Sequence, residues 1–210
     1  MFVYLEKTIA TQNLSGTITL IDLLFFSVQP IQCLYDCFCY YNPYNRTNVY
    51  DCSNQNYTAL PHSVQPGTNW LSLHNNSLTS LSVPQAYFDV TSYIDVSTNS
   101  ILAITDDVIA AFNKSNTLKG LNLTYNKLNS ISIAFRTLSK LQIWLYGNCF
   151  DCNCDMTWMI DWFNTSSVQD GKSIRCATGS QIGTLIYKLN ATKMGCGPTY
   201  TELPHWAVPV

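Results

Sequence analysis

The chain has 210 residues, and its 11 basic and 13 acidic side chains make up only 11% of it, against roughly 25% in typical globular domains. The formal net charge of −2 excludes a protein that binds nucleic acid by neutralising phosphates, which needs a basic face. The 47% hydrophobic and 13% aromatic content argues against disorder because it is sufficient for a core, and no run reaches the roughly 18 apolar residues of a membrane-spanning helix.

Residues 1–29 form a leader that only partly fits a secretory signal peptide. Its best apolar run, residues 18–26, contains Asp22, and Lys7 is the only basic residue before that run. We interpret the leader as an imperfect signal peptide or a faulty gene start, with an ordinary buried segment as the alternative.

Cysteines gather near the two ends of the remaining chain. The first cluster is Cys33, Cys37, Cys39 and Cys52, and the second is Cys149, Cys152, Cys154, Cys176 and Cys196. The 96 residues between the clusters, 53–148, contain none. Two short clusters that flank a segment without crosslinks are typical of an oxidising compartment. Spacing alone leaves three disulfide connectivities open for each set of four.

Glycosylation acceptors of the Asn-X-Ser/Thr type favour the same compartment. They begin at eight positions: Asn13, Asn45, Asn56, Asn75, Asn113, Asn122, Asn164 and Asn190. Glycans at these sites would supply the solvation that the missing charges do not. The alternative is chance, because the chain is rich in Asn, Ser and Thr. If the leader is cleaved, Asn13 is irrelevant.

A repeated pattern, L-x-L-x-x-N-x-L with Ile, Val or Phe in some apolar positions, occupies the middle of the chain. It occurs four times, beginning at Leu71, Ile94, Leu121 and Ile143, with offsets of 23, 27 and 22 residues. These offsets fall in the roughly 20–29 residue range of leucine-rich repeats. The 27-residue offset indicates an insertion near residues 106–116.

Each part of the pattern has a physical role. The alternating apolar residues of L-x-L point to one face, as in a β-strand. The shared asparagine can then satisfy backbone groups that a turn leaves unpaired; its four positions are Asn76, Asn99, Asn126 and Asn148. One coil cannot bury its apolar side alone, so stacked coils share a core and their open ends need covers.

The flanking cysteine clusters resemble the caps of extracellular leucine-rich-repeat proteins. The spacing Cys33-x3-Cys37-x-Cys39-x12-Cys52 resembles their amino-terminal cap. The segment 148–162, which reads NCFDCNCDMTWMIDW, resembles the opening of their carboxy-terminal cap closely. With the repeats, the resemblance covers residues 33–196. It implies an α/β fold: a short leucine-rich-repeat solenoid with a parallel concave β-sheet, an irregular or helical convex side, and two disulfide-bonded caps.

The same resemblance implies a domain organisation and a disulfide pairing. An amino-terminal cap would span residues 33–68, about four repeats 69–148, a carboxy-terminal cap 149–197 and a Pro-containing tail 198–210, after the leader 1–29. Within each cap the first cysteine would pair with the third and the second with the fourth. The implied bridges are Cys33–Cys39, Cys37–Cys52, Cys152–Cys176 and Cys154–Cys196. Each could add about 2–4 kcal/mol by restricting the unfolded chain.

Cys149 departs from the family pattern, which usually has Pro at this position, and it makes the cysteine count odd. It could be buried, modified, or bonded to a second chain in a covalent dimer. Cys149, Cys152 and Cys154 also look like metal ligands, but no second pair stands at zinc spacing. A thioredoxin-like role lacks its βαβ context. We therefore expect neither a metal nor a cofactor.

The outward-facing positions of the predicted strands form the candidate binding surface. They are Trp70, Ser72, His74, Tyr93, Asp95, Ser97, Asn122, Thr124, Gln142, Trp144 and Tyr146. Exposed aromatic side chains on a rigid sheet are typical of protein interfaces. The alternative is that Trp70 and Trp144 pack beneath the caps. A glycan on Asn122 would obstruct the centre of this surface, in which case partners bind at an edge or on the convex side.

No feature of the sequence indicates catalysis. His74, Asp95 and Ser72 superficially resemble a catalytic triad, but an open sheet lacks the enclosed pocket that catalysis needs. Residues 179–183 read Gly-Ser-Gln-Ile-Gly and are not a nucleophile elbow. Phosphate-binding glycine loops, HExxH and EF-hand spacing are absent from the sequence. We expect a protein that is not an enzyme.

Three function classes remain. The first is a secreted, extracellular, non-enzymatic module that binds a protein ligand or receptor, and no nucleic acid, through the repeat surface. The second is an ectodomain fragment of a leucine-rich-repeat cell-surface receptor for adhesion, guidance or innate immunity, and the third is a structural protein of the extracellular matrix. The tail 198–210 has neither a membrane span nor a hydrophobic anchor end, which favours secretion. The scaffold alone does not choose a partner.

Overall fold

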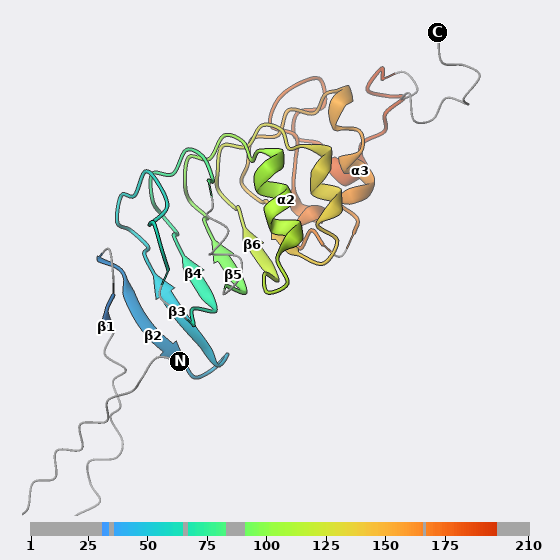
Figure 1. Cartoon of the computed structure of the whole chain (residues 1–210). Helices are drawn as coiled ribbons and strands as arrows, with labels where there is room; N and C mark the ends of the chain where they lie inside the picture. Colours follow the sequence, from blue (N-terminus) through green and yellow to red (C-terminus); the bar gives the residue numbers. More distant parts are fainter. Residues whose placement is uncertain (1–30, 34–35, 65–66, 83–90, 166, 197–210) are drawn as a thin grey trace, which may run out of the picture.

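The computed structural model describes residues 31–33, 36–64, 67–82, 91–165 and 167–196. The predictions for the leader 1–29, for Asn13 and for the tail 198–210 lie outside the described residues. Seven strands form one sheet in chain order (Figure 1). They are β1 (Ile31–Gln32), β2 (Phe38–Asn42), β3 (Thr47–Asp51), β4 (Trp70–Ser72), β5 (Tyr93–Asp95), β6 (Gly120–Asn122) and β7 (Gln142–Trp144).

The strand pairing in the sheet changes from antiparallel to parallel at β3. Strands β1, β2 and β3 pair antiparallel, whereas β3 to β7 pair parallel. The parallel register aligns equivalent residues of successive repeats, so their inward side chains stack in one buried row: Tyr50, Leu71, Ile94, Leu121 and Ile143. This arrangement confirms the predicted leucine-rich-repeat solenoid.

The repeated asparagines form a hydrogen-bond ladder along the turns that follow the strands. The side-chain amide of Asn126 donates to the carbonyls of Val96 (3.0 Å) and Leu123 (3.1 Å), and its Oδ1 accepts from the Ile101 amide (3.0 Å). Asn76, Asn99 and Asn148 make equivalent bonds in their own repeats. Each asparagine therefore ties its own turn to the preceding coil.

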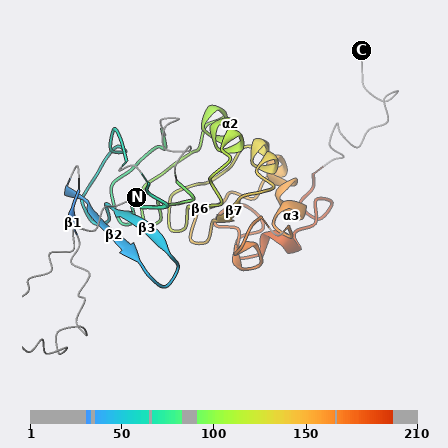
Figure 2. The same cartoon turned by 60° about the horizontal axis from the view of Figure 1, so that its bottom comes forward.

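The side opposite the strands is irregular with short helices, as predicted. Helix α2 (Asp106–Lys114) lies in the longest interval between repeats, the one of 27 residues, and it packs Val108, Ile109 and Phe112 into the core. A 3₁₀ turn, η2 (Ile133–Thr137), fills the same place in the next coil. Figure 2 shows α2 on the side of the coils away from β6 and β7.

The carboxy-terminal cap supplies a substitute for the missing next strand. It contains η3 (Cys154–Met156), α3 (Met159–Trp162), η4 (Gly171–Ser173) and η5 (Ile186–Lys188). The Ile143 amide of β7 donates to the Ser167 carbonyl (2.7 Å), and the Gln169 amide donates back to Ile143 (2.9 Å). Edge-to-face aromatic contacts such as that of Phe135 on η2 with Trp162 on α3 (ring centroids 5.9 Å apart) join the repeats to the cap.

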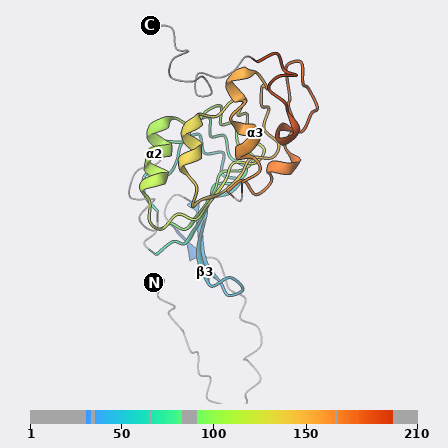
Figure 3. The same cartoon turned by 90° about the vertical axis from the view of Figure 1, so that its right-hand side faces the viewer.

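At the other end, the antiparallel hairpin of β2 and β3 extends the sheet and projects beyond the coils (Figure 3). Disulfides hold both caps. The structure pairs the cysteines as the family resemblance implies: Cys33–Cys39, Cys37–Cys52, Cys152–Cys176 and Cys154–Cys196.

Candidate protein-binding face

The outward side of strands β3 to β7, which we call the concave face, presents its side chains in three rows. The register defines the first row as Val49, Trp70, Tyr93, Gly120 and Gln142, and the second as Asp51, Ser72, Asp95, Asn122 and Trp144. Backbone hydrogen bonds just past the strands continue a third row of Ser53, His74, Ser97, Thr124 and Tyr146. All eleven binding residues predicted from the sequence lie in these rows.

Three large aromatic side chains lie close together in the first and second rows. The rings of Trp70 and Tyr93 stack with centroids 5.2 Å apart and an interplanar angle of 22°. A β-carbon at Gly120 would lie 2.5 Å from Cδ1 of Tyr93 and 3.2 Å from Cζ3 of Trp144. Both rings therefore lean into the space that Gly120 leaves open. Trp70, Tyr93 and Trp144 are all half-buried, and they form an aromatic lane across β4 to β7.

The polar side chains beside this lane are connected in an order that does not suit catalysis. Nδ1 of His74 lies 2.9 Å from Oγ of Ser97, and that hydroxyl donates to Oδ1 of Asp95 (2.6 Å). In a catalytic triad the imidazole lies between the hydroxyl and the carboxylate, whereas here Ser97 occupies the middle. Ser72, the hydroxyl considered from the sequence, pairs with Ser53 at 2.7 Å. The resemblance to a triad therefore has no counterpart in the geometry.

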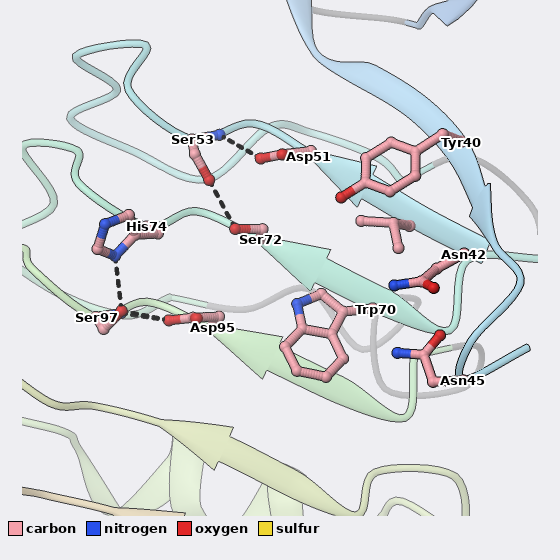
Figure 4. Close-up of a pocket in the computed structure, with 11 residues that line it drawn as sticks. Tyr40, Asn42, Asn45, Asp51, Ser53, Trp70, Ser72, His74, Asp95 and Ser97 are labelled. Carbon is pink, nitrogen blue, oxygen red and sulfur yellow. Dashed lines mark hydrogen bonds between the residues drawn. The ribbon is translucent and has the colours of Figure 1, made fainter. Parts of the chain in front are cut away.

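A pocket of about 520 Å³ opens at the amino-terminal end of the concave face (Figure 4). Its lining comes from β2, β3, β4, β5 and the turns that follow them: Tyr40, Asn42, Asn45, Val49, Asp51, Ser53, Trp70, Ser72, His74, Asp95 and Ser97. Burial, and secondarily the negative charge of Asp51, raises the pKa of Tyr40 above its ordinary value. We call this hollow the amino-terminal pocket.

Sequence reasoning found half of this pocket and missed the rest. The residues on β4 and β5 were predicted because the repeat pattern fixes their outward direction. Tyr40, Asn42, Asn45 and Asp51 belong to the cap hairpin, which carries no repeat pattern. The parallel pairing of β3 with β4 is what places Asp51 beside Ser72.

A second hollow of about 580 Å³ lies at the carboxy-terminal end, lined by Tyr146, Asp170, Lys172, Ser173, Arg175 and Leu185. Its Asp170 carboxylate accepts from the amides of Leu145 (2.9 Å) and Tyr146 (2.6 Å). Burial, opposed by these two hydrogen bonds, raises the pKa of Asp170 above its ordinary value. Sequence analysis gave no signal for this contact, because the cap has no repeat to align.

The predicted glycosylation sites differ in accessibility. Six are exposed: Asn45, Asn56, Asn75, Asn113, Asn164 and Asn190. Asn122 is half-buried in the second row, and its Oδ1 accepts from both the amide (3.1 Å) and the hydroxyl (2.8 Å) of Thr124. Asn45 lines the amino-terminal pocket. A glycan on either of these two residues would stand on or beside the concave face.

Cys149 is exposed and unpaired, so the alternative that it is buried is wrong. Its neighbours Cys152 and Cys154 are both in disulfides, which leaves them without the thiolates that metal binding needs. Among the described residues, no group of three or more His, Cys, Asp or Glu side chains could hold a metal ion. In the same part of the chain, no helix is long and apolar enough to span a membrane.

The fold and its caps define a class of protein. The chain has a leucine-rich-repeat fold whose ends are closed by disulfide-bonded, cysteine-rich caps, and it resembles extracellular proteins of this type. No family model matches it. Over 95 residues it is 33% identical to the high affinity nerve growth factor receptor of Gallus gallus. The aligned region covers 44% of this chain and 12% of the receptor. It is also 27% identical over 112 residues to trophoblast glycoprotein of Macaca fascicularis, covering 50% of this chain and 26% of that protein.

Solved structures share the architecture. Human 5T4, the trophoblast glycoprotein, superposes on this chain with a TM-score of 0.54 and 22% sequence identity. The superposed region covers 63% of this chain and 48% of the 5T4 chain. A structure of the Toll–Spatzle complex matches with a TM-score of 0.61 at 20% identity over 77% of this chain and 21% of that one. The chain thus spans only a small part of the receptors that it resembles, and the similarity concerns their leucine-rich-repeat fold.

Proposed function

We propose that this chain is an extracellular, non-enzymatic recognition module that binds a protein partner through its concave face. The observation that carries the proposal is the aromatic lane formed by Trp70, Tyr93 and Trp144 across neighbouring strands. Large aromatic side chains on a rigid surface lose little conformational entropy when a partner covers them, and they are typical anchors of protein interfaces.

Three further observations support a recognition role. The strands that carry the lane are held in register by hydrogen bonds and by the buried asparagine ladder, so the surface is preorganised before a partner arrives. Both relatives named above are receptors or glycoproteins by name. Toll, whose fold is similar, is known in complex with Spatzle. A recognition module of a receptor-type protein is the function that these features favour.

The four disulfides support an extracellular location. Four bridges in a chain of this size persist in an oxidising environment and are rare in the cytosol. Exposed glycosylation sites on several faces suit the same location. The proposal therefore places the concave face outside the cell, where it meets protein partners.

Affinity capture tests the proposal. The secreted, glycosylated chain is immobilised and used to capture partners from intact cell surfaces, with crosslinking before lysis. We expect Tyr93→Ala and Trp144→Ala to weaken capture at least about tenfold, since central aromatic anchors typically contribute about 2 kcal/mol or more. Ile133→Ala provides the control, because Ile133 is an exposed apolar residue on η2, on the opposite side. Equal capture by all three variants would show that the concave face is not the binding surface.

A further inference from the structure

The amino-terminal pocket holds both formally charged residues of the three rows of the concave face. Its formally charged lining residues are Asp51 and Asp95, and neither Lys nor Arg is among the residues that line it. The rings of Trp70 and Tyr40 stand over the same hollow (Figure 4). The pocket therefore combines negative charge with aromatic surface.

Each of the two carboxylates has one oxygen that can accept a hydrogen bond from a ligand. Oδ1 of Asp51 accepts from the Ser53 amide at 3.0 Å. Oδ1 of Asp95 accepts from the amide (2.9 Å) and the hydroxyl (2.6 Å) of Ser97. Within the described part of the chain, Oδ2 of neither carboxylate accepts a hydrogen bond. The local bonds fix the direction of both carboxylates and leave one oxygen of each open to a ligand.

The spacing of these groups suits one long basic side chain. Asp51 and Asp95 flank Ser72 in the register, and adjacent strands lie about 4.8 Å apart, so their Cα atoms are separated by about 10 Å. A guanidinium group donates two parallel hydrogen bonds to a carboxylate and stacks favourably on an indole ring. An ammonium group lacks the planar shape that uses both features.

We propose that the amino-terminal pocket binds an arginine side chain of the protein partner. The inference rests on the proposed function and adds the chemistry of one contact to it. Charge complementarity carries it, because the pocket lining has two carboxylates and no basic side chain. Arginine is also among the residues that contribute most at the centres of protein interfaces.

A pair of small probes isolates this chemistry: N-acetyl-arginine-N-methylamide and its citrulline analogue, which has a nearly identical shape and no charge. The full disulfide-bonded chain is labelled with ¹⁵N-tryptophan, and the indole N–H signal of Trp70 is identified with the Trp70→Phe variant. All proteins carry Asn45→Gln, because Asn45 lines the pocket and heads an Asn-Arg-Thr sequon. Titrations at low salt then follow that one signal.

We expect the arginine probe to shift the Trp70 signal saturably and to bind at least about fivefold more tightly than the citrulline probe. Asp51→Asn and Asp95→Asn should each weaken arginine binding by about three- to tenfold, because each removes one carboxylate charge. Asp161→Asn removes the same charge from an exposed site on α3, at the opposite end of the solenoid (Figure 1), and should leave binding unchanged.

Two results would overturn the inference: equal binding of the citrulline probe, or Asp51→Asn and Asp95→Asn variants that bind arginine as well as Asp161→Asn does. Near-ultraviolet circular dichroism of each variant checks that the fold is retained. The proposed function fails by a different result, namely partner capture that survives Tyr93→Ala and Trp144→Ala. If capture depends on these aromatic residues while the arginine probe does not bind, only the present inference is wrong.

Discussion

The ring of Tyr93 occupies the space above Gly120 in which any other residue would place its β-carbon, with Cδ1 2.5 Å from that position. The glycine is needed here for close approach and not for its backbone conformation, since its φ angle is not positive. Its missing side chain lets Tyr93 of one repeat reach toward Trp144 two strands away. The continuity of the aromatic lane thus depends on a residue that contributes no surface of its own.

Substituting Gly120→Ala should displace the Tyr93 ring and break the lane. We expect partner capture to weaken severalfold, with a loss of about 1 kcal/mol in unfolding free energy, because the ring can rotate away from the new methyl group. Near-ultraviolet circular dichroism measures the change in the Trp70–Tyr93 stack. In a Tyr93→Ala background the new methyl group still meets Cζ3 of Trp144 at 3.2 Å but no longer meets the much closer Tyr93 ring, so Gly120→Ala should then have a clearly smaller structural effect. An equal effect in both backgrounds would contradict the role given to Tyr93.

The buried asparagine ladder should be the most sensitive polar element of the solenoid. Asn126→Ala leaves the buried amide of Ile101 without its acceptor, and it removes one of the two side-chain donors from the carbonyls of Val96 and Leu123. Unsatisfied buried groups cost about 1–3 kcal/mol each, and we expect a total loss of about 2–4 kcal/mol in urea unfolding followed by circular dichroism. Asn116→Ala, at an exposed position, is the matched control and should change stability by less than about 0.5 kcal/mol.

The repeats were predictable because each carries its own pattern. Leu121 and Leu123 alternate into the core and Asn126 closes the turn, and the same arrangement recurs in the other coils. Periodicity therefore determined the strands, the buried row and the outward residues. It also located the insertion at residues 106–116, although the helical form of that insertion, α2, depends on packing Phe112 against the core.

The ends and the site details were not predictable from such a pattern. Which side chains meet across strands depends on register and rotamer: His74 reaches Ser97 and not Ser72. The amino-terminal pocket is half made of the cap hairpin, and Asp51 enters it only because β3 pairs with β4. The contact of Asp170 with Leu145, directly after β7, joins residues 25 positions apart without any repeated motif.

Thiol labelling tests the disulfide arrangement. Cys149 is exposed and free while the other eight cysteines are paired, so native protein should take up one maleimide per chain and the reduced, unfolded chain nine. Cys149→Ser should take up none in the native state. A covalent dimer through Cys149 would instead give no native labelling and a doubled mass on non-reducing gels, and that result would contradict a free thiol.

Asp170 closes the last coil by replacing a strand. In an inner repeat the Leu123 amide donates to the Trp144 carbonyl of the next strand (2.9 Å). The equivalent amide of the last repeat, Leu145, donates to the Asp170 carboxylate instead (2.9 Å). The cap thereby satisfies an edge amide that would otherwise lie unpaired beside the core.

The burial of the Asp170 carboxyl group predicts a particular dependence of stability on pH. Burial raises the pKa of Asp170 in the folded protein, so the unfolded chain releases this proton at a lower pH than the folded chain does. The stabilising contribution of the group is therefore full below the ordinary pKa of about 3.9 and is lost as the pH rises through the raised value.

The side chain of Asp170→Asn cannot titrate in this range. The melting temperature of the wild type should therefore fall relative to that of Asp170→Asn across this acidic window, and the two melting curves should run parallel above it. Asp161→Asn serves as the exposed control. A constant difference between wild type and Asp170→Asn throughout the acidic range would mean that the carboxylate of Asp170 does not titrate differently in the folded chain.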